Sequence, residues 1–509
     1  MSSKQTNYAL GIDIGTTAVK VVLIGEGGEY AAEVNRPHNL LSLHPGWAEE
    51  DAGVWWQNTC DALAELARLH PGKMGGVRGI GVSGMVPAIV LLGQNGEVLR
   101  NTIQQNDARA AGQVTRLQAE INQEELYART CGYTNQQHVL PRLLWVKENE
   151  PGVWQNTAAV LGSYDYIVYR LTGQKQVEIN WAVESGLFDV HTRRWLTGDM
   201  QRYGVSPGLF PAVSPSGSVV GHTGGLASLG LADGIPVIAG SADHVASAFS
   251  AGILEEGSLL IKFGGAGDIL YCVNEIAPCK DLFFDFHLLP GKYLVNGCMA
   301  ASGSLVKWYT KDILGEDGGQ SLQELDRRAE KVPPASDGLI ILPYLLGEKT
   351  PLFDPAARGV LFGLTLAHTK EHIFRAVLEA VIYGFRHHLE VMEQAGLHPT
   401  QIIATNGGAK SAFWCQIAAD VLARPVLSYP KHPGSALGVA FLAGLSTGVF
   451  ASCEELHLFL QQSKVYTPKP ENIPVYNRAY AIYRGLYQQL RPSFAAVQQL
   501  YEGYGAQQA

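Results

Sequence analysis

A short turn near the start of the chain combines residue types that suit phosphate and magnesium binding. It reads Asp13-Ile-Gly-Thr-Thr17, so the backbone at Gly15 and the hydroxyls of Thr16 and Thr17 can direct donors at phosphate oxygens. Asp13 follows an apolar segment and could hold Mg2+ through bound water, because this ion keeps most of its hydration shell. An ordinary hairpin turn has the same composition, so both interpretations stay open for this turn alone.

A second glycine turn lies in the other half of the chain, at Gly264-Gly-Ala-Gly-Asp268. Gly264, Gly265 and Gly267 allow the backbone to approach a ligand closely or to adopt a positive φ. A bulge at a sheet edge is the alternative interpretation. Two similar turns, one in each half, favour a nucleotide whose phosphates are held by two domains.

A third glycine segment, Thr405-Asn-Gly-Gly-Ala-Lys-Ser411, follows an apolar stretch and opens a predicted helix. It is not a P-loop, because that motif requires Gly-Lys-Ser/Thr and Ala409 precedes the lysine here. We expect its glycines to bring the backbone close to an adenine or a ribose at the start of the helix.

Asp243 ends an apolar segment and is the candidate general base. Phosphoryl transfer from ATP needs a group that accepts the proton of the attacking hydroxyl, and a carboxylate within hydrogen-bond reach can do this. Aspartate also caps helices readily, so an N-cap for the following helix is the alternative, and the two roles are compatible.

The elements that position these residues repeat along the chain. Residues 8–13 and 19–23 read as two strands joined by the first turn, and residues 258–263 and 269–273 as two strands joined by the second. Paired strands that alternate with helices predict an α/β protein with a mixed sheet. Apolar spacing predicts a helix over residues 51–70 with Val54, Leu63, Leu66 and Leu69 on one face. Further helices are expected at residues 302–313, 370–394, 411–422, 435–447 and 477–498.

Length and charge restrict the class of protein. With 509 residues the chain exceeds one hydrophobic core, so we expect two large domains that meet near residue 250. The 38 basic and 47 acidic residues give a net charge of 38 − 47 = −9, which argues against nucleic acid as a partner. We see no apolar run long enough for a membrane and no signal peptide. Seven scattered cysteines, none in C-x-x-C spacing, favour a reduced cytoplasmic protein.

Two further segments carry a resemblance to a known family. Gly359-Val-Leu-Phe-Gly-Leu364, followed after seven residues by His372-Ile-Phe-Arg-Ala-Val-Leu-Glu379, is similar to one signature of the FGGY carbohydrate kinases. Pro141-Arg-Leu-Leu-Trp-Val-Lys-Glu-Asn149 is similar to the other, except that Arg142 replaces the usual lysine. From about Tyr8 to about Leu490 the chain resembles this family, and within it the xylulokinases.

The resemblance implies a fold and an activity. The fold would be two actin-like (ribonuclease H-like) ATPase domains with the active site in the cleft between them. Residues 1–250 would bind the sugar and carry the first phosphate loop, and residues 251–509 would bind the nucleotide. A terminal helix at about 477–498 could pack back on the first domain. The activity would be ATP-dependent phosphorylation of a small sugar, with Mg2+ as cofactor.

Roles follow position by position from the same resemblance. Asp243 matches the catalytic base, Asp13 would hold Mg2+ through water, and the segment from Gln105 to Arg109 is similar to one whose aspartate binds sugar hydroxyls. The residues implied at the sugar are Met85, Val86, Asp107, Asp243 and His244. The residues implied at the nucleotide are Gly15, Thr16, Thr17, Gly264, Gly265, Gly267, Gly303, Lys307, Gly408 and Ala409.

Two departures bear on the substrate. Xylulokinases typically have Met-His-Gly where this chain has Met85-Val86-Pro87, and an asparagine where it has His244. His244 could replace the lost contact with the sugar, or it could be a buried or supporting histidine. Met85 could contact the sugar or could only pack against neighbouring side chains.

The leading substrate that the resemblance implies is D-xylulose, phosphorylated at its 5-hydroxyl. Ribulose, another ketose, glycerol or erythritol are the alternatives within the class. An actin-like or chaperone-like ATPase is expected to carry a peptide-binding or polymerising segment, and we identify none in the sequence. A sugar-responsive regulator is expected to carry a helix-turn-helix, and we identify none of these either. ATP and a small sugar are therefore the expected partners, and a homodimer stays open.

Overall fold

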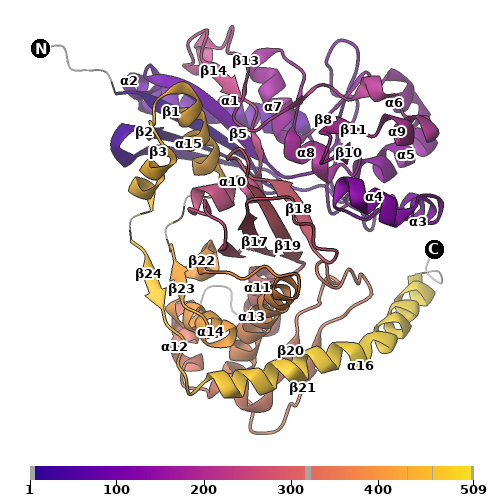
Figure 1. Ribbon diagram of the computed structural model, residues 1–509, viewed down its shortest axis with the longest axis vertical. Coiled ribbons are helices and arrows are strands. Elements are labelled where there is room, and N and C mark those ends of the chain that lie inside the picture. The colour runs from indigo at the N-terminus through magenta and orange to yellow at the C-terminus, as the bar shows by residue number, and fades with distance from the viewer. Residues whose placement is uncertain (1–5, 316–321, 431, 433, 461, 506–509) are drawn as a thin grey trace, which may run out of the picture. The chain divides into compact units, whose positions relative to one another are not determined.

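The computed structural model describes residues 6–315, 322–430, 432, 434–460 and 462–505, and the side chains up to residue 500 (Figure 1). Contacts between Cα atoms divide the chain into two compact units. Unit 1 comprises Met1–Gly252, Phe284–Leu294 and Pro433–Phe459, and unit 2 comprises Ile253–Phe283, Val295–His432 and Leu460–Ala509. The chain therefore changes unit at Gly252 and returns to unit 1 twice.

A mixed seven-stranded sheet forms the centre of unit 1. The strand order is β13-β14-β5-β1-β2-β3, and β15 also pairs with β5. Strand β1 is antiparallel to β2 but parallel to β5, and both β14 and β15 are parallel to β5. The carboxyl ends of β1, β5 and β15 therefore meet at one edge of the sheet. The bounds are β1 Tyr8–Ile14, β2 Ala18–Gly25, β3 Glu29–Pro37, β5 Val77–Gly84, β13 Val219–His222, β14 Pro236–Ile238 and β15 Ser241–Ala242.

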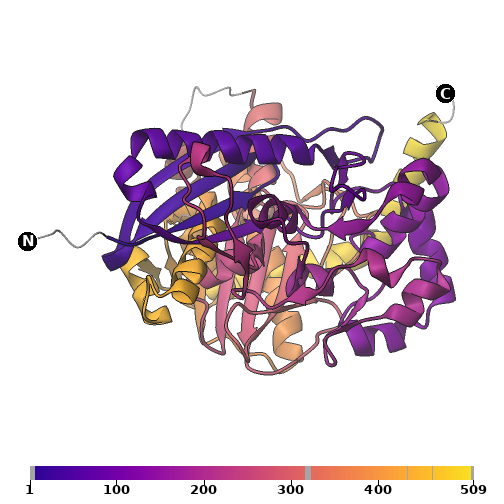
Figure 2. The same ribbon diagram turned by 90° about the horizontal axis from the view of Figure 1, so that it is seen from above.

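Helices cover both faces of this sheet. Helix α1 (Ala52–Leu69) and helix α15 (Ser435–Thr447) lie on opposite sides of the indigo strands, as Figure 2 shows. Helix α15 approaches the strands closely because glycines face it. A Cβ at Gly11 would lie 2.0 Å from the carbonyl oxygen of Ala436, and one at Gly81 would lie 2.3 Å from that of Val439. Helix α10 (Asp243–Ser250) packs on α15 in turn.

The remaining elements of unit 1 are short. They are β4 Glu49–Glu50, α2 Pro71–Met74, β6 Val90–Leu92, β7 Thr102–Ile103, α3 Ala111–Glu120, α4 Gln123–Thr130, α5 Val139–Asn149, α6 Pro151–Asn156, β8 Ala159–Leu161, α7 Ser163–Thr172, β9 Val177–Glu178, α8 Ile179–Glu184, β10 Phe188–Asp189, β11 Arg194–Trp195, α9 Thr197–Arg202 and β12 Val213–Ser214. Among the helices, α7 packs against β5.

Unit 2 repeats the strand pairing of unit 1. Its sheet has the order β18-β19-β17-β16-β22-β23-β24, and the tip of the β18–β19 hairpin is counted with unit 1. Strand β16 is antiparallel to β17 and parallel to β22, as β1 is to β2 and β5. The predicted duplication is therefore confirmed. The bounds are β16 Ser258–Phe263, β17 Gly267–Val273, β18 Phe283–Phe286, β19 Tyr293–Met299, β22 Gln401–Thr405, β23 Val426–Ser428 and β24 Lys464–Tyr466.

Two long helices of unit 2 match their predicted ranges closely, and the terminal helix is longer at both ends than the predicted 477–498. Helix α13 spans Lys370–Gln394, α14 spans Ala412–Leu422, and the terminal helix α16 spans Ile473–Gly505. Tyr480 of α16 donates to Glu390 of α13 (2.7 Å), so these two helices pack within unit 2. The other elements are α11 Gly303–Trp308, α12 Leu322–Ala329, β20 Ile340–Leu342 and β21 Val360–Phe362. No helix among the described residues is both long and apolar enough to cross a membrane.

Candidate active site

Two aspartates lie at the same edge of the unit 1 sheet. Asp13 is the second-last residue of β1, next to the turn, and pairs with Ser83 of β5. The hydroxyl of Ser83 donates to Asp13 Oδ1 (2.7 Å). Asp243 directly follows β15, which pairs in parallel with the end of β5. The predicted metal ligand and the predicted base are thus brought together by three neighbouring parallel strands.

The pKa of Asp13 is raised, first by burial and second by the negative charge of Asp243. Two carboxylates that repel each other in a part-buried position are a donor set that a hard divalent cation suits, because a cation relieves the repulsion. The residues present therefore fit a divalent ion held through Asp13.

Asp243 is the first residue of α10, and the N-cap position belongs to Ala242, which makes no side-chain capping bond. The N-cap alternative for Asp243 is therefore wrong. Its side chain is 37% exposed, so the carboxylate is accessible to a ligand.

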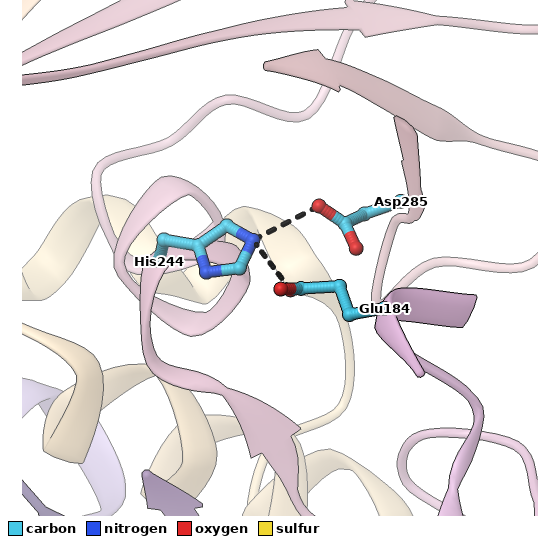
Figure 3. Close-up of side chains that lie close together, drawn as sticks. All are labelled: Glu184, His244 and Asp285. Atoms are coloured by element: carbon cyan, nitrogen blue, oxygen red, sulfur yellow. Dashed lines mark hydrogen bonds and ion pairs between the residues drawn. The ribbon is translucent and has the colours of Figure 1, made fainter. Parts of the chain in front are cut away.

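His244 follows Asp243 in the chain, and two more carboxylates lie beside its ring, as Figure 3 shows for Glu184 and Asp285. His244 Nε2 lies 2.9 Å from Asp285 Oδ2 and 3.5 Å from Glu184 Oε1. His244 Nδ1, on the other side of the ring, lies 3.5 Å from Asp243 Oδ1. These side chains come from α10, from β18 and from the end of α8, and the donor atoms of Glu184, His244 and Asp285 all lie within 4.8 Å of one another.

Charge distribution in this group favours a protonated imidazole. Burial lowers the pKa of His244, but the charge of Asp285 and the contacts with Asp243 and Glu184 outweigh it, so the pKa lies well above the ordinary value. Burial, followed by the charge of Asp285, raises the pKa of Glu184 well above its ordinary value. The neighbouring carboxylates account for the raised pKa of His244, whereas burial is the largest cause for Glu184, whose pKa the charge of His244 lowers.

Glu184 and Asp285 were not predicted as functional residues. They are about one hundred residues apart in the sequence, and no motif links them. The side chain of Asn180 links the two segments: its Oδ1 accepts from the N–H of Phe286 (2.8 Å) and its Nδ2 donates to the carbonyl oxygen of Phe286 (3.0 Å). This non-local pairing helps to bring the two carboxylates to His244.

The other predicted sugar residues are buried. Met85 and Val86 are 1% and 2% exposed, and the backbone N–H of Met85 donates to the carbonyl of Ile14 (3.1 Å), at the same edge of the sheet. Asp107 is fully buried and accepts from the N–H of Ala48 (2.6 Å) and from the guanidinium of Arg109 (2.7 Å). The carboxylate of Asp107 is therefore held inside unit 1 by protein donors.

Arg142, which replaces the usual lysine of the first family signature, is fully buried among backbone carbonyls. It donates to the carbonyls of Ile103 (3.2 Å), Gln104 (3.1 Å), His138 (3.2 Å) and Gln137. Burial lowers its pKa to about 9. An ammonium has only three donors, so the planar guanidinium of arginine serves this set of acceptors better.

In unit 2 the second glycine turn is bonded to the start of α11. The N–H groups of Gly303 and Ser304 donate to the carbonyls of Gly264 (2.7 Å) and Gly265 (3.1 Å), and that of Ser302 also donates to Gly265 (2.9 Å). A Cβ at Gly265 would meet nothing within 4 Å, so this face of the turn is open. The turn thus has a fixed backbone and a free face, which fits a phosphate ligand.

We expect Gly303→Ala to weaken ATP use. A Cβ at position 303 would lie 2.7 Å from the Gly264 carbonyl oxygen, so the turn must move. The KM for ATP should rise about tenfold, with a smaller change in the KM for the sugar. Gly485→Ala is the matched control, because a Cβ there meets nothing within 4 Å, and it should leave the KM for ATP unchanged. An unchanged KM for ATP in Gly303→Ala would contradict the expected role of this turn.

The third glycine segment is packed more tightly than the second turn. A Cβ at Gly408 would lie 2.5 Å from Phe263 Cβ and 2.5 Å from the ring of Trp414, and Ala409 is only 2% exposed. The absence of a side chain at Gly408 therefore has a packing reason. Lys307 of α11 is exposed.

Residues 8–250 match the N-terminal domain of the FGGY family of carbohydrate kinases, and residues 283–447 match its C-terminal domain. This chain belongs to the FGGY family. It is 32% identical to the xylulose kinase of Bacillus subtilis (strain 168), an alignment that covers 94% of this chain and 96% of that protein. It is 26% identical to the gluconokinase of Bacillus licheniformis over 97% of this chain and 98% of that one.

A solved structure is also similar over nearly the whole chain. The crystal structure of xylulose kinase from Rhodospirillum rubrum matches with a TM-score of 0.89 and 40% identity, covering 96% of this chain and all of that one. The predicted two-domain actin-like fold and the predicted family are confirmed. The protein is thus a carbohydrate kinase, and FGGY kinases use ATP, generally with a divalent metal.

Proposed function

We propose that this FGGY kinase transfers the γ-phosphoryl group of ATP to the 5-hydroxyl of D-xylulose, with Mg2+ as the metal. The observation that carries this proposal is the placement of Asp13 and Asp243 at one edge of the unit 1 sheet. The xylulose kinases of Bacillus subtilis and Rhodospirillum rubrum, similar over nearly the whole chain, support the choice of sugar.

Each residue has a proposed task. Asp243 accepts the proton of the sugar hydroxyl, and Asp13 holds the metal through water. Sugar contacts are proposed for Met85, Val86, Asp107 and His244. Nucleotide contacts are proposed for Gly15, Thr16, Thr17, Gly264, Gly265, Gly267, Gly303, Lys307, Gly408 and Ala409.

The proposed reaction is an in-line displacement. The 5-oxygen of xylulose forms a bond to the γ-phosphorus, the bond from that phosphorus to the bridging oxygen of ADP breaks, and the hydroxyl proton passes to Asp243. A divalent metal, when bound, neutralises charge on the phosphates. The accessible carboxylate of Asp243 at the start of α10 suits the role of base, because a substrate hydroxyl can come within hydrogen-bond reach of it.

A coupled ADP-release assay over a panel of acceptors tests the proposal. The panel contains D-xylulose, D-ribulose, glycerol, erythritol and D-gluconate at equal concentrations. We expect the highest kcat/KM with D-xylulose. A higher kcat/KM with any other member would overturn the choice of sugar, and no sugar-dependent ADP release would overturn the proposed activity.

We further expect D-gluconate to be a poor substrate, although a gluconokinase is among the relatives. The carboxylates of Glu184, Asp243 and Asp285 contact one imidazole, and Asp243 also acts on Asp13, so an anionic acceptor meets net repulsion. One unbalanced charge at about 6 Å with an effective dielectric constant of about 20 costs about 3 kcal/mol, or about 100-fold in kcat/KM. Equal kcat/KM for D-gluconate and D-xylulose would contradict this charge argument.

We propose the cytoplasm as the location and a homodimer as the assembly. The cysteines form no disulfide among the described residues, which fits a reducing compartment. Large apolar side chains of unit 2 are exposed between residues 346 and 366, which favours a covered surface. They are Leu346, Phe353, Leu361, Phe362, Leu364 and Leu366. Light scattering at micromolar concentration distinguishes a dimer from a monomer of 55.0 kDa.

A further inference from the structure

His244 is held from one side and faces the proposed base on the other. Its Nε2 contacts the carboxylates of Asp285 (2.9 Å) and Glu184 (3.5 Å), and its Nδ1 is 3.5 Å from Asp243 Oδ1 (Figure 3 shows the first side). The ring is mostly buried, with 16% of the side chain exposed. An imidazole fixed through one nitrogen has its other nitrogen fixed in direction as well.

Asp285 and Glu184 are themselves positioned by the fold. The side chain of Asn180 bonds both backbone groups of Phe286, next to Asp285, and Glu184 ends the short helix α8 that contains Asn180. Asp285 is 1% exposed, so its carboxylate lies in a low-dielectric environment where an ion pair is strong. The direction of Nδ1 is therefore determined by residues that lie outside α10.

We propose that His244 is a positioning residue for Asp243: held by Asp285 and Glu184, its imidazolium orients the Asp243 carboxylate toward the hydroxyl that reacts. This inference rests on the proposed function, in which Asp243 is the base. With Oδ1 turned to Nδ1–H, the second oxygen of Asp243 is left to accept the substrate proton. The step balances without His244 gaining or losing a proton.

The charged groups near His244 are almost all acidic. Asp243 shares its helix, and Glu184 and Asp285 contact the ring. The charge of Glu178 acts on Glu184, and that of Asp243 acts on Asp13. The packing partners α15 and β15 carry no charged residue, and Arg78 of β5 lies at the opposite end of that strand. These surroundings keep His244 protonated at neutral pH, in agreement with its raised pKa.

A distinctive pH dependence follows. Once His244 loses its proton, the imidazole can no longer donate to Asp285 and Asp243 at the same time, so the carboxylate is no longer oriented. We expect kcat/KM for D-xylulose to fall as the pH rises through the pKa of His244, above the ordinary histidine range. Lower pH restores the cation and the activity.

The experiment measures kcat and kcat/KM for D-xylulose between pH 6 and 10 in wild-type protein, His244→Asn, His244→Gln and Asp285→Asn. In His244→Asn and His244→Gln we expect kcat to fall about tenfold, as for a misplaced catalytic group, while the KM for ATP is unchanged. The decline at alkaline pH should vanish in both. In Asp285→Asn the decline should move to lower pH, because a negative charge that favours the imidazolium is gone. His222 is an exposed residue of β13, so His222→Asn serves as the control and should keep the wild-type dependence of kcat/KM on pH.

Two different failures can be told apart. If the wild-type protein releases no ADP with D-xylulose, the proposed function fails. If wild-type protein is active but His244→Asn retains the alkaline decline, or Asp285→Asn leaves it in place, the inference about His244 is overturned. Circular dichroism of each variant identifies unfolding. If His244→Asn does not fold, Asp285→Asn, which keeps the histidine, still tests the positioning role through the shift of its alkaline decline to lower pH.

Discussion

Asp243→Asn should lower kcat for sugar phosphorylation by about 1,000-fold while the affinity for ATP changes little. Proton acceptance by a positioned carboxylate contributes about 100- to 10,000-fold, and an amide oxygen cannot supply it. Asparagine has nearly the same volume, and Asp243 makes no capping bond that the amide would lose. Steady-state ADP release and a separate nucleotide-binding titration measure the two effects.

Asp199→Asn is the matched control for this variant. Asp199 also lies in the first turn of a helix in unit 1, and its side chain is 29% exposed and pairs with Arg129 (3.3 Å). Its removal costs only a helix-dipole contribution and a surface ion pair, each about 1 kcal/mol or less. Turnover in Asp243→Asn within tenfold of wild type would exclude Asp243 as the base.

Asp13→Asn should reduce kcat/KM by about 100-fold or more at low Mg2+, and part of this loss should be recovered by raising the Mg2+ concentration. The carboxylate lies beside Asp243 and is bonded to Ser83, so its charge contributes to a site for a hard cation. Removal of the divalent ion with EDTA should abolish turnover in the wild type, and added Mg2+ should restore it. Activity measured against Mg2+ concentration gives the apparent KM for the metal.

Asp189→Asn is the control for Asp13→Asn. Asp189 also ends a strand of unit 1 and is mostly buried, but its carboxylate accepts from the N–H groups of His191 (3.0 Å) and Thr192 (2.9 Å). We expect its apparent KM for Mg2+ to match that of wild type. An equal KM for Mg2+ in wild type and Asp13→Asn would show that Asp13 does not support the metal.

Local sequence patterns predicted much of the fold. The glycine turns with their flanking strands were predicted because each hairpin is local, and helices such as 370–394 and 435–447 were predicted to the residue. On α1 the prediction was only partly right. Leu63 and Leu66 are buried, whereas Val54 and Leu69 are 40% and 48% exposed, because the core face runs through Trp55 instead. Periodicity identifies a helix more reliably than the residues that face its partner.

Sequence patterns could predict only those residues of the candidate site that lie at the end of a strand. Asp13 and Asp243 each end a strand, so the topology alone brings them to one sheet edge. Glu184 and Asp285 depend on contacts between distant segments, which no local pattern reveals. Gly408 illustrates a different limit, because close packing on Trp414 and close approach of a ligand both favour glycine.

A crystal structure of the wild-type protein with D-xylulose and a non-hydrolysable ATP analogue is the most direct measurement. The proposed mechanism predicts a carboxylate oxygen of Asp243 within about 3.2 Å of the sugar 5-oxygen, which in turn faces the terminal phosphorus. A complex in which another carboxylate contacts the reacting hydroxyl, with Asp243 turned to solvent, would contradict it.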